Sequence, residues 1–258
     1  MNLNVSLVQP YLVWENTNVN LTRIEKLING IQVSTDLIVL PEMFPTGFSM
    51  NTQSVAENMR GPSMQWLMNT ASERSCCITG SIMIKDGDNY YNRLIFMFPS
   101  GDFKIYDKRH LFRMGEEDKY FKPGKQSIII ELNKWRIKPL ICYDLRFPVW
   151  SRNRNDYDLL IYVASWPEPR IEVWDALLKA RAIENQSYVI GVSRIGKDAN
   201  NLNHTGDSTI FDFKGRQILK LPSNTETTAT ITLDKKTLDE FRKVFPVWRD
   251  SDEFKLID

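Results

Sequence analysis

The sequence predicts one α/β domain built around large mixed β-sheets. Strand-like and helix-like patterns alternate along all 258 residues. Helices join the early strands, whereas the middle and the end of the chain contain hairpin-like pairs. Several strands are apolar on both faces, so each sheet should be covered on both sides. A four-layer α-β-β-α sandwich satisfies these patterns, and three layers stay open.

The first third of the chain alternates three predicted strands with two predicted helices. In the first helix, apolar residues recur at helical spacing and Gly30 follows as a stop signal. The strand after it is a short apolar run closed by Pro41, as expected for a fully buried strand. The strands are predicted at 2–10, 35–42 and 76–84, and the helices at 20–31 and 62–75.

The middle of the chain favours paired strands. Turn signals at Asp86-Gly87 and Ser100-Gly101 separate successive strands. A helix is predicted at 146–155, after the second of two further strands. The strands expected in this part lie at 92–98, 102–107, 127–132, 137–143 and 158–164.

The last third contains the clearest helical pattern, at 171–185. Ile171, Trp174, Leu178 and Ile183 fall near one face of that helix. Asp234 is a candidate cap for a final helix that runs to about Val244. Strands are predicted at 187–195, 208–213, 216–221 and 228–233.

Composition excludes several classes of protein. The net charge is +1, so no overall basic field favours nucleic acid. Three cysteines, Cys76, Cys77 and Cys142, give an odd count without a CxxC pair, which argues against a disulfide framework and a zinc site. We expect no signal peptide and no membrane span, and therefore a cytoplasmic protein.

Common catalytic motifs are missing from the sequence. It lacks GxGxxG, GxxxxGK[ST], GxSxG and HExxH, which argues against dinucleotide, phosphate-loop, serine-hydrolase and zincin chemistry. The two histidines, His110 and His204, are too far apart for a compact metal motif. We expect neither a metal nor an organic cofactor.

Three polar residues instead follow apolar runs, where α/β folds present reactive groups. They are Glu42, Lys108 and Cys142. A carboxylate could accept the thiol proton, the thiolate could attack a carbonyl, and the ammonium could stabilise the oxyanion. Taken singly, each has a plainer interpretation: a core cysteine, a helix-capping glutamate and a solvated lysine.

Three segments around these residues, "LPEMFPTGF", "YDKRHLF" and "LICYDLRFP", together resemble the nitrilase (carbon–nitrogen hydrolase) superfamily in order and spacing. The likeness covers nearly the whole chain. It implies a four-layer α-β-β-α sandwich with two mixed sheets and a catalytic set of Glu42, Lys108 and Cys142. It also implies a second glutamate that assists deacylation, for which Glu117 is a better match than Glu116.

Within the superfamily, "CYDLRFP" looks like the omega-amidase branch, and bacterial omega-amidases (2-oxoglutaramate amidases) are the nearest likeness. This resemblance implies hydrolysis of the terminal amide of 2-oxoglutaramate or 2-oxosuccinamate to ammonia and a dicarboxylate. Such activity belongs to salvage of transamination products, including methionine salvage. The alternatives are a carbamoylase, a deaminated-glutathione amidase, or a non-catalytic binding protein of the same fold.

A substrate with a distal carboxylate needs a cation, and arginine binds a carboxylate bidentately. Arg146 and Arg170 are the candidates, although Arg146 could instead be a structural ion-pair partner. Tyr143 and Trp166 could form walls of the pocket or pack in the core. Phe44 and Phe48 have the same two interpretations.

The end of the chain, "FPVWRDSDEF", is aromatic although it follows the last predicted helix. Residues 1–258 are expected to form a single carbon–nitrogen hydrolase domain, in which 245–258 are a tail. In the superfamily that the sequence resembles, such tails pack on a neighbouring subunit. The resemblance therefore implies a homodimer or a higher homo-oligomer.

Overall fold

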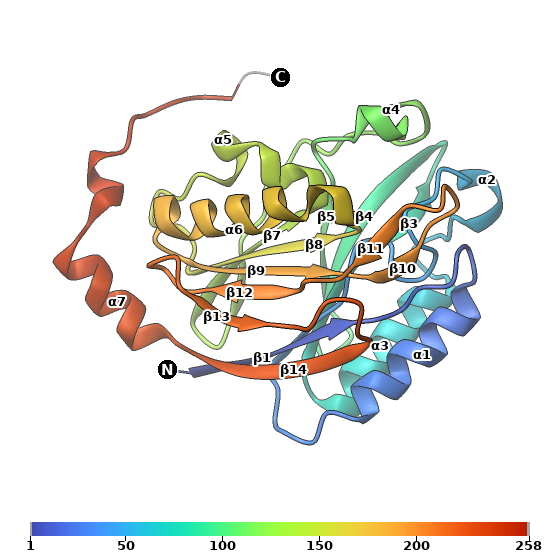
Figure 1. Ribbon diagram of the computed structural model, residues 1–258, viewed down its shortest axis with the longest axis horizontal. Helices are drawn as coiled ribbons and strands as arrows, with labels where there is room; N and C mark the ends of the chain where they lie inside the picture. The colour runs from blue at the N-terminus through green and yellow to red at the C-terminus, as the bar shows by residue number, and fades with distance from the viewer. Residues whose placement is uncertain (1, 257–258) are drawn as a thin grey trace.

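Two six-stranded mixed sheets form the centre of the molecule in the computed structural model, which describes residues 2–256 (Figure 1). The first sheet has the order β14-β1-β2-β3-β4-β5 and the second has the order β13-β12-β9-β8-β7-β6. The strands of the first are β1 (Asn2–Gln9), β2 (Leu37–Val39), β3 (Cys77–Asp86), β4 (Asn89–Met97), β5 (Phe103–Asp107) and β14 (Thr227–Asp234). Those of the second are β6 (Ile130–Leu132), β7 (Trp135–Ile141), β8 (Leu159–Ala164), β9 (Tyr188–Ser193), β12 (Thr209–Phe211) and β13 (Gln217–Lys220).

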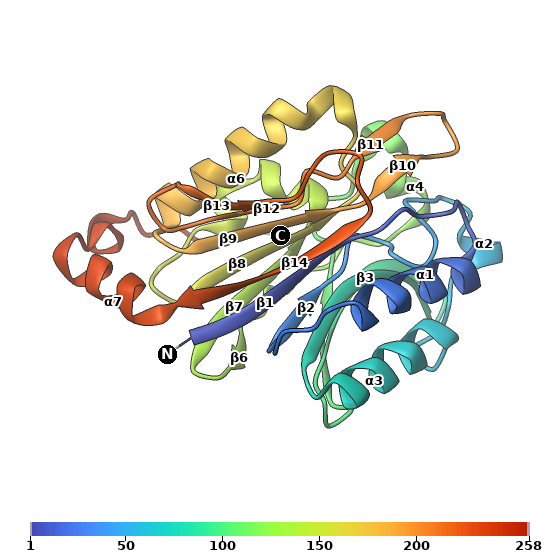
Figure 2. The same ribbon diagram turned by 60° about the horizontal axis from the view of Figure 1, so that its bottom comes forward.

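Helices cover the outer face of each sheet, which confirms the four-layer α-β-β-α sandwich (Figure 2). Helices α1 (Thr17–Asn29) and α3 (Pro62–Arg74) lie on the first sheet, and α6 (Ile171–Asn185) lies on the second. In both sheets the three central strands are parallel and the outer ones pair antiparallel. The carboxyl ends of β2, β7 and β8 therefore become places to mount functional side chains.

The alternation of side chains along each strand divides the core into layers. Leu37 and Val39 of β2 belong to the large cluster between the two sheets, whereas Ile38 and Leu40 pack with residues of α1 and α3. All four are fully buried. Burial of such a side chain contributes about 1.5–3 kcal/mol, so the apolar run predicted as a buried strand holds two layers together.

Polar side chains fix where two of the predicted helices begin. Helix α1 starts at Thr17, three residues earlier than predicted, because the Asn16 side chain accepts a hydrogen bond from the Val19 backbone N–H. Asp234 caps α7 (Lys235–Val244) in the same way by accepting from the Lys236 N–H. The predicted cap and the predicted end of this last helix are confirmed.

The predicted helix at 146–155 was wrong. The chain forms a 3₁₀ turn, η2 (Cys142–Arg146), then the short α5 (Pro148–Ser151), and leaves helical geometry at Arg152. The Asn153 side chain bonds to backbone groups of Asp156 and Tyr157, and side-chain bonds of this kind compete with a helix.

Two further details differ from the sequence patterns. Ile183, expected on the buried face of α6, is 49% exposed, while Trp174 and Leu178 are fully buried as predicted. A small hairpin of β10 (Ile195–Lys197) and β11 (Asn203–Thr205), joined by residues 198–202, had no clear pattern in the sequence.

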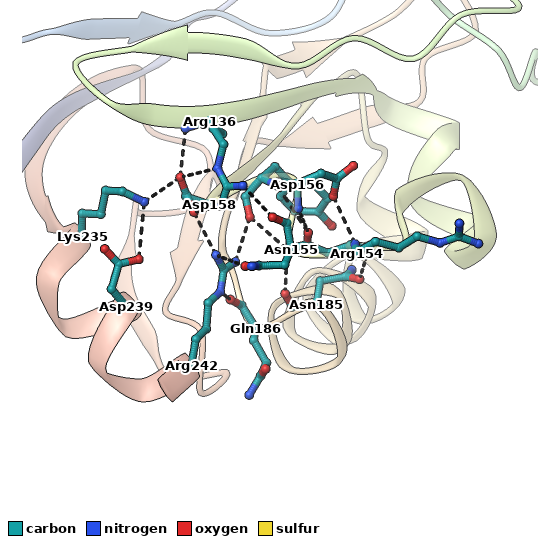
Figure 3. A network of polar contacts seen from close by, with 12 residues as sticks. Arg136, Arg154, Asn155, Asp156, Asp158, Asn185, Gln186, Lys235, Asp239 and Arg242 are labelled. Carbon is teal, nitrogen blue, oxygen red and sulfur yellow. Dashed lines mark hydrogen bonds and ion pairs between the residues drawn. The ribbon is translucent and has the colours of Figure 1, made fainter. Parts of the chain in front are cut away.

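A buried ion cluster holds α7 on the second sheet (Figure 3). The Asp158 carboxylate accepts from Arg136 and Arg242 at 2.8 Å each and lies 2.7 Å from the Lys235 ammonium. Asp158 is fully buried. We call these four residues the Asp158 cluster; it ties β7, the start of β8 and the C-terminal helix together. None of the helices in the described residues is long and apolar enough to cross a membrane.

Candidate active site

Glu42 lies just after β2, at the seam between the two sheets. Its backbone N–H donates to the Ala164 carbonyl of the second sheet at 3.3 Å, and the N–H of Met43 donates to Ser81 Oγ of the first sheet. The side chain is fully buried. The Ser165 N–H donates to Glu42 Oε2 at 3.0 Å, so this carboxylate has a fixed direction.

Lys108 follows β5 and points at two carboxylates. Its ammonium nitrogen lies 2.8 Å from Glu42 Oε1, and 3.1 and 2.9 Å from Glu117 Oε1 and Oε2. Glu117 begins the short helix α4 (Glu117–Tyr120) and also accepts from the Phe112 N–H at 2.6 Å. Glu116 instead pairs with Lys119 at the surface. The structure therefore brings Glu117, not Glu116, into the site.

Asn92 of β4 also belongs to this cluster, and sequence reasoning missed it. Its Nδ2 donates to Glu42 Oε1 at 2.8 Å and to Glu117 Oε1 at 3.0 Å. An asparagine inside a strand gives no local signal of such a role, because its partners are 50 and 25 residues away in the chain. We call Glu42, Lys108, Glu117 and Asn92 the Lys108 cluster.

Cys142 lies directly after β7, at the first residue of η2. Its φ of +43° is in the left-handed region, which is costly for a residue with a side chain and is typical of functional turns. Asp144 holds this turn by accepting from the Ile141 N–H, the His110 N–H and the Tyr106 hydroxyl. The strain at Cys142 is thus sustained by a buried carboxylate that also ties the turn to the segment after Lys108.

The environment keeps the Cys142 proton in place at rest. Burial raises the pKa of the thiol well above its ordinary value, the Glu42 carboxylate raises it further, and Lys108 only partly offsets this. The charge of Lys108 acts toward the thiolate but is outweighed. Because Glu42 lines the same cavity and its charge acts on the thiol, this carboxylate is placed to accept the proton.

The two carboxylates of the Lys108 cluster favour the protonated form of Lys108. Burial lowers the pKa of Lys108, but the Glu117 and Glu42 carboxylates outweigh burial and raise it above its ordinary value. Burial raises the pKa of Glu117, Lys108 lowers it and Glu42 raises it again, with a net increase. One cation shared by two carboxylates leaves this site with a surplus of proton acceptors.

A cavity of about 550 Å³ opens over Cys142, Glu42 and Lys108. Arg146 lies over the Trp166 ring at 5.4 Å and Arg170 over the Phe112 ring at 5.3 Å, both on the cavity wall. Neither arginine forms an ion pair with any residue in the range 2–256. The structure thus gives Arg146 an aromatic neighbour and not the structural ion-pair partner that the sequence had left open.

The remaining aromatic candidates divide between cavity and core. Tyr143 and Trp166 line the cavity, as does Phe48, whose ring lies 5.0 Å from the Lys108 ammonium. Phe44 is fully buried and packs against Trp66 under α3. Within residues 2–256, no group of three or more His, Cys, Asp or Glu residues is arranged to hold a metal ion.

Comparison with known proteins places this geometry in a family. The carbon-nitrogen hydrolase family model matches residues 4–243. The omega-amidase YafV of Escherichia coli K12 is 43% identical over 98% of both chains, and a 2-oxoglutaramate amidase of Bacillus subtilis is 31% identical over 97% of this chain and 98% of its own.

Solved structures agree with the family match. The Xanthomonas campestris protein XC1258, a CN-hydrolase superfamily protein with an arsenic adduct in its active site, superposes with a TM-score of 0.96, at 39% identity and 99% coverage of both chains. Yeast Nit3, described as a member of branch 10 of the nitrilase superfamily, superposes with a TM-score of 0.84 at 27% identity and 95% coverage of both. The chain therefore belongs to the carbon–nitrogen hydrolase family and is an enzyme that hydrolyses amide carbon–nitrogen bonds.

Proposed function

We propose that the enzyme is an omega-amidase that hydrolyses the terminal amide of a small carboxylic acid, such as 2-oxoglutaramate or 2-oxosuccinamate. The observation that carries this proposal is the position of Cys142, Glu42 and Lys108 in one cavity that also holds two arginines, neither of which forms an ion pair with another described residue. The names of the relatives at 43% and 31% identity support the same substrate class.

Acylation begins with the thiol. Glu42 accepts the Cys142 proton as the sulfur attacks the amide carbonyl, so the anion never has to persist in a site that disfavours it. Lys108 and the Tyr143 backbone N–H at the start of η2 stabilise the oxyanion. Glu42 then passes the proton to the departing nitrogen, the carbon–nitrogen bond breaks, and ammonia leaves a thioester on Cys142.

Deacylation uses the same carboxylate in reverse. Water attacks the thioester carbonyl while Glu42, supported by Glu117 across Lys108, accepts a water proton. The carbon–sulfur bond breaks, the proton returns to Cys142, and the carboxylic acid product ionises. The side chains supply every proton transfer in this sequence.

The distal carboxylate of the substrate is bound by Arg170 or Arg146. Both guanidinium groups lie on aromatic rings, which hold their planes without using the donors needed for a carboxylate. Replacing the binding arginine by methionine should raise KM about tenfold for a substrate with that carboxylate. A matched amide that ends in a methyl group should show no such rise, which identifies which arginine binds the carboxylate.

Ammonia release from a panel tests the function. The panel contains 2-oxoglutaramate, 2-oxosuccinamate, a carbamoyl amino acid, deaminated glutathione and a simple nitrile. Cys142→Ala should abolish release, with Cys77→Ala as the matched loss of a buried thiol elsewhere. Glu42→Gln should fail to accumulate acyl-enzyme by mass spectrometry. Activity retained by Cys142→Ala, or a clear preference for a carbamoyl substrate, would contradict the proposal.

We further propose that the enzyme works as a cytoplasmic homodimer in salvage of transamination products, including methionine salvage. The tail at 245–258 would pack on the neighbouring subunit; its last two residues lie outside the described range. Exposed apolar side chains at Val244, Phe245 and Phe254 support this proposal. Sedimentation of the full chain and of one ending at residue 244 tests it, since a monomeric full chain would contradict it.

A further inference from the structure

The Lys108 ammonium has as many carboxylate oxygens within hydrogen-bonding distance as it has N–H donors. An ammonium group has three donors. The Lys108 nitrogen lies within 3.1 Å of three carboxylate oxygens, namely Glu42 Oε1 and both oxygens of Glu117. With one N–H on each oxygen, Lys108 turns one N–H away from a buried carboxylate when it stabilises an oxyanion, and a buried acceptor that loses its donor costs about 1–3 kcal/mol.

Each of these oxygens nevertheless has a second donor. Asn92 Nδ2 donates to Glu42 Oε1 at 2.8 Å and to Glu117 Oε1 at 3.0 Å. The Phe112 N–H donates to Glu117 Oε2. Asn92 therefore serves two of the three oxygens that Lys108 serves.

We infer that Asn92 is a positioning residue that holds Glu42 and Glu117 in place while Lys108 turns toward the reacting carbonyl. The inference rests on the roles proposed above for Glu42, Lys108 and Cys142. Without Asn92, an N–H that moved to the substrate from Glu42 Oε1 or Glu117 Oε1 would leave that buried oxygen bare, whereas Glu117 Oε2 would keep the Phe112 N–H. With Asn92 present, the Lys108 N–H exchanges its bond to the carboxylate for a bond to the substrate, and the carboxylate oxygen keeps a donor.

Asn92 is itself firmly held. It is 1% exposed within β4, and its backbone carbonyl accepts from the Lys108 N–H at 3.0 Å. Its side-chain Oδ1 is buried without a hydrogen-bond partner among residues 2–256. A buried acceptor without a donor lowers stability. The Asn92 amide is therefore oriented so that Nδ2 can donate to both carboxylates, at the expense of a hydrogen bond to Oδ1.

Asn92→Leu tests the inference because it keeps the volume and removes both donors. We expect kcat for 2-oxoglutaramate to fall about 10- to 100-fold, as for loss of support to an oxyanion donor, with KM within about twofold. The acid limb of the kcat/KM profile should move to higher pH. Glu42, Glu117, Lys108 and Cys142 meet there, and the hydrogen bond from Asn92 lowers the pKa of Glu117, so loss of Asn92 favours protonation of that acid.

Thr79→Val is the matched control. Thr79 is a buried residue of the neighbouring strand β3 whose hydroxyl donates to the Ile95 carbonyl, so Thr79→Val tests the loss of a buried hydrogen bond outside the Lys108 cluster. Unchanged kcat and pH profile in Asn92→Leu, or a change confined to KM, would overturn the inference. If Asn92→Leu does not fold, Asn92→Ser, which keeps one donor in less volume, is measured by the same criteria.

Different results would contradict the proposed mechanism and the proposed role of Asn92. Turnover by Cys142→Ala would remove the proposed mechanism as a whole. Inactive Cys142→Ala together with a wild-type profile in Asn92→Leu would remove only the role of Asn92. Acyl-enzyme trapping adds a separate readout, since Asn92→Leu should form thioester slowly but still form it, whereas Cys142→Ala cannot.

Discussion

The Lys108 cluster and the Asp158 cluster have opposite arrangements of charge. In the first, one ammonium serves the carboxylates of Glu42 and Glu117. In the second, the single carboxylate of Asp158 serves three cations. Both central groups are fully buried.

The difference appears in the pKa values of the acids. Burial would raise the pKa of Asp158, but hydrogen bonds from Arg136 and Lys235 outweigh it and hold the pKa at about 2. Glu117, which shares its cation, has a raised pKa because burial dominates. A surplus of cations makes an acid inert near neutral pH, whereas a surplus of acids leaves proton acceptors for chemistry. One cluster holds the fold together and the other is suited to proton transfer.

The largest expected effect comes from Lys108→Met. It removes the only cation of the Lys108 cluster, so turnover should fall at least about a thousandfold through loss of the oxyanion donor. The two acids left behind should also lower the free energy of unfolding by about 3–5 kcal/mol. Ammonia release and urea denaturation measure the two effects. Substantial activity in a folded Lys108→Met variant would show that the Lys108 cluster, like the Asp158 cluster, is not needed for catalysis.

Asp158→Asn should act on stability alone. The isosteric change leaves three cations around a neutral amide, and we expect a loss of about 3 kcal/mol in the free energy of unfolding. The kcat of the folded protein should not change, because the Asp158 cluster does not touch the cavity. A loss of kcat below the unfolding transition would show that the two clusters are coupled.

Lowering the pH should change the contributions of the two clusters to the free energy of unfolding in opposite directions. The folded pKa of Asp158, about 2, is below the ordinary 3.8; its contribution of about 2 kcal/mol is therefore present above pH 4 and lost as the pH falls toward 2. The difference in unfolding free energy between the wild type and Asp158→Asn should shrink across that window. Glu117, with a raised pKa, contributes in the opposite direction, and stability relative to Glu117→Gln should rise as that carboxyl takes up its proton.

Lys235→Met should have the smallest effect. It removes one of three cations around Asp158, and this side chain is partly exposed. We expect a loss of at most about 1 kcal/mol and no change in kcat, measured in the same urea and ammonia assays. A loss in the free energy of unfolding as large as that of Lys108→Met would contradict the comparison. It would mean that the stabilisation from one cation does not depend on how many other cations share its carboxylate.

Local pattern was enough to predict most of the fold. Buried strands such as Leu37–Val39 and the capped helix after Asp234 are encoded within a few residues. The helix predicted at 146–155 failed because the Asn153 side chain donates to the Asn185 carbonyl, 32 residues away, and also bonds to its own neighbours. The residues around position 153 do not reveal a partner so far away in the chain.

The candidate site divides in the same way. Glu42, Lys108 and Cys142 each follow an apolar strand, so the sequence could nominate them, and the structure brings them to one cavity. Neither Asn92 of this site nor Arg242 of the Asp158 cluster could be nominated. Their partners lie 50 and 84 residues away, and neither type of residue is unusual in its local context.

The position of Glu42 and Cys142 on different sheets has a consequence for synthesis of the protein. The first sheet supplies Glu42 and Lys108, the second supplies Cys142, and β14 then returns to pair with β1. A chain emerging from the ribosome therefore carries an ordinary thiol until both sheets have docked. We expect the nascent chain to lack the assembled set of Glu42, Lys108 and Cys142 until its last strand has been made.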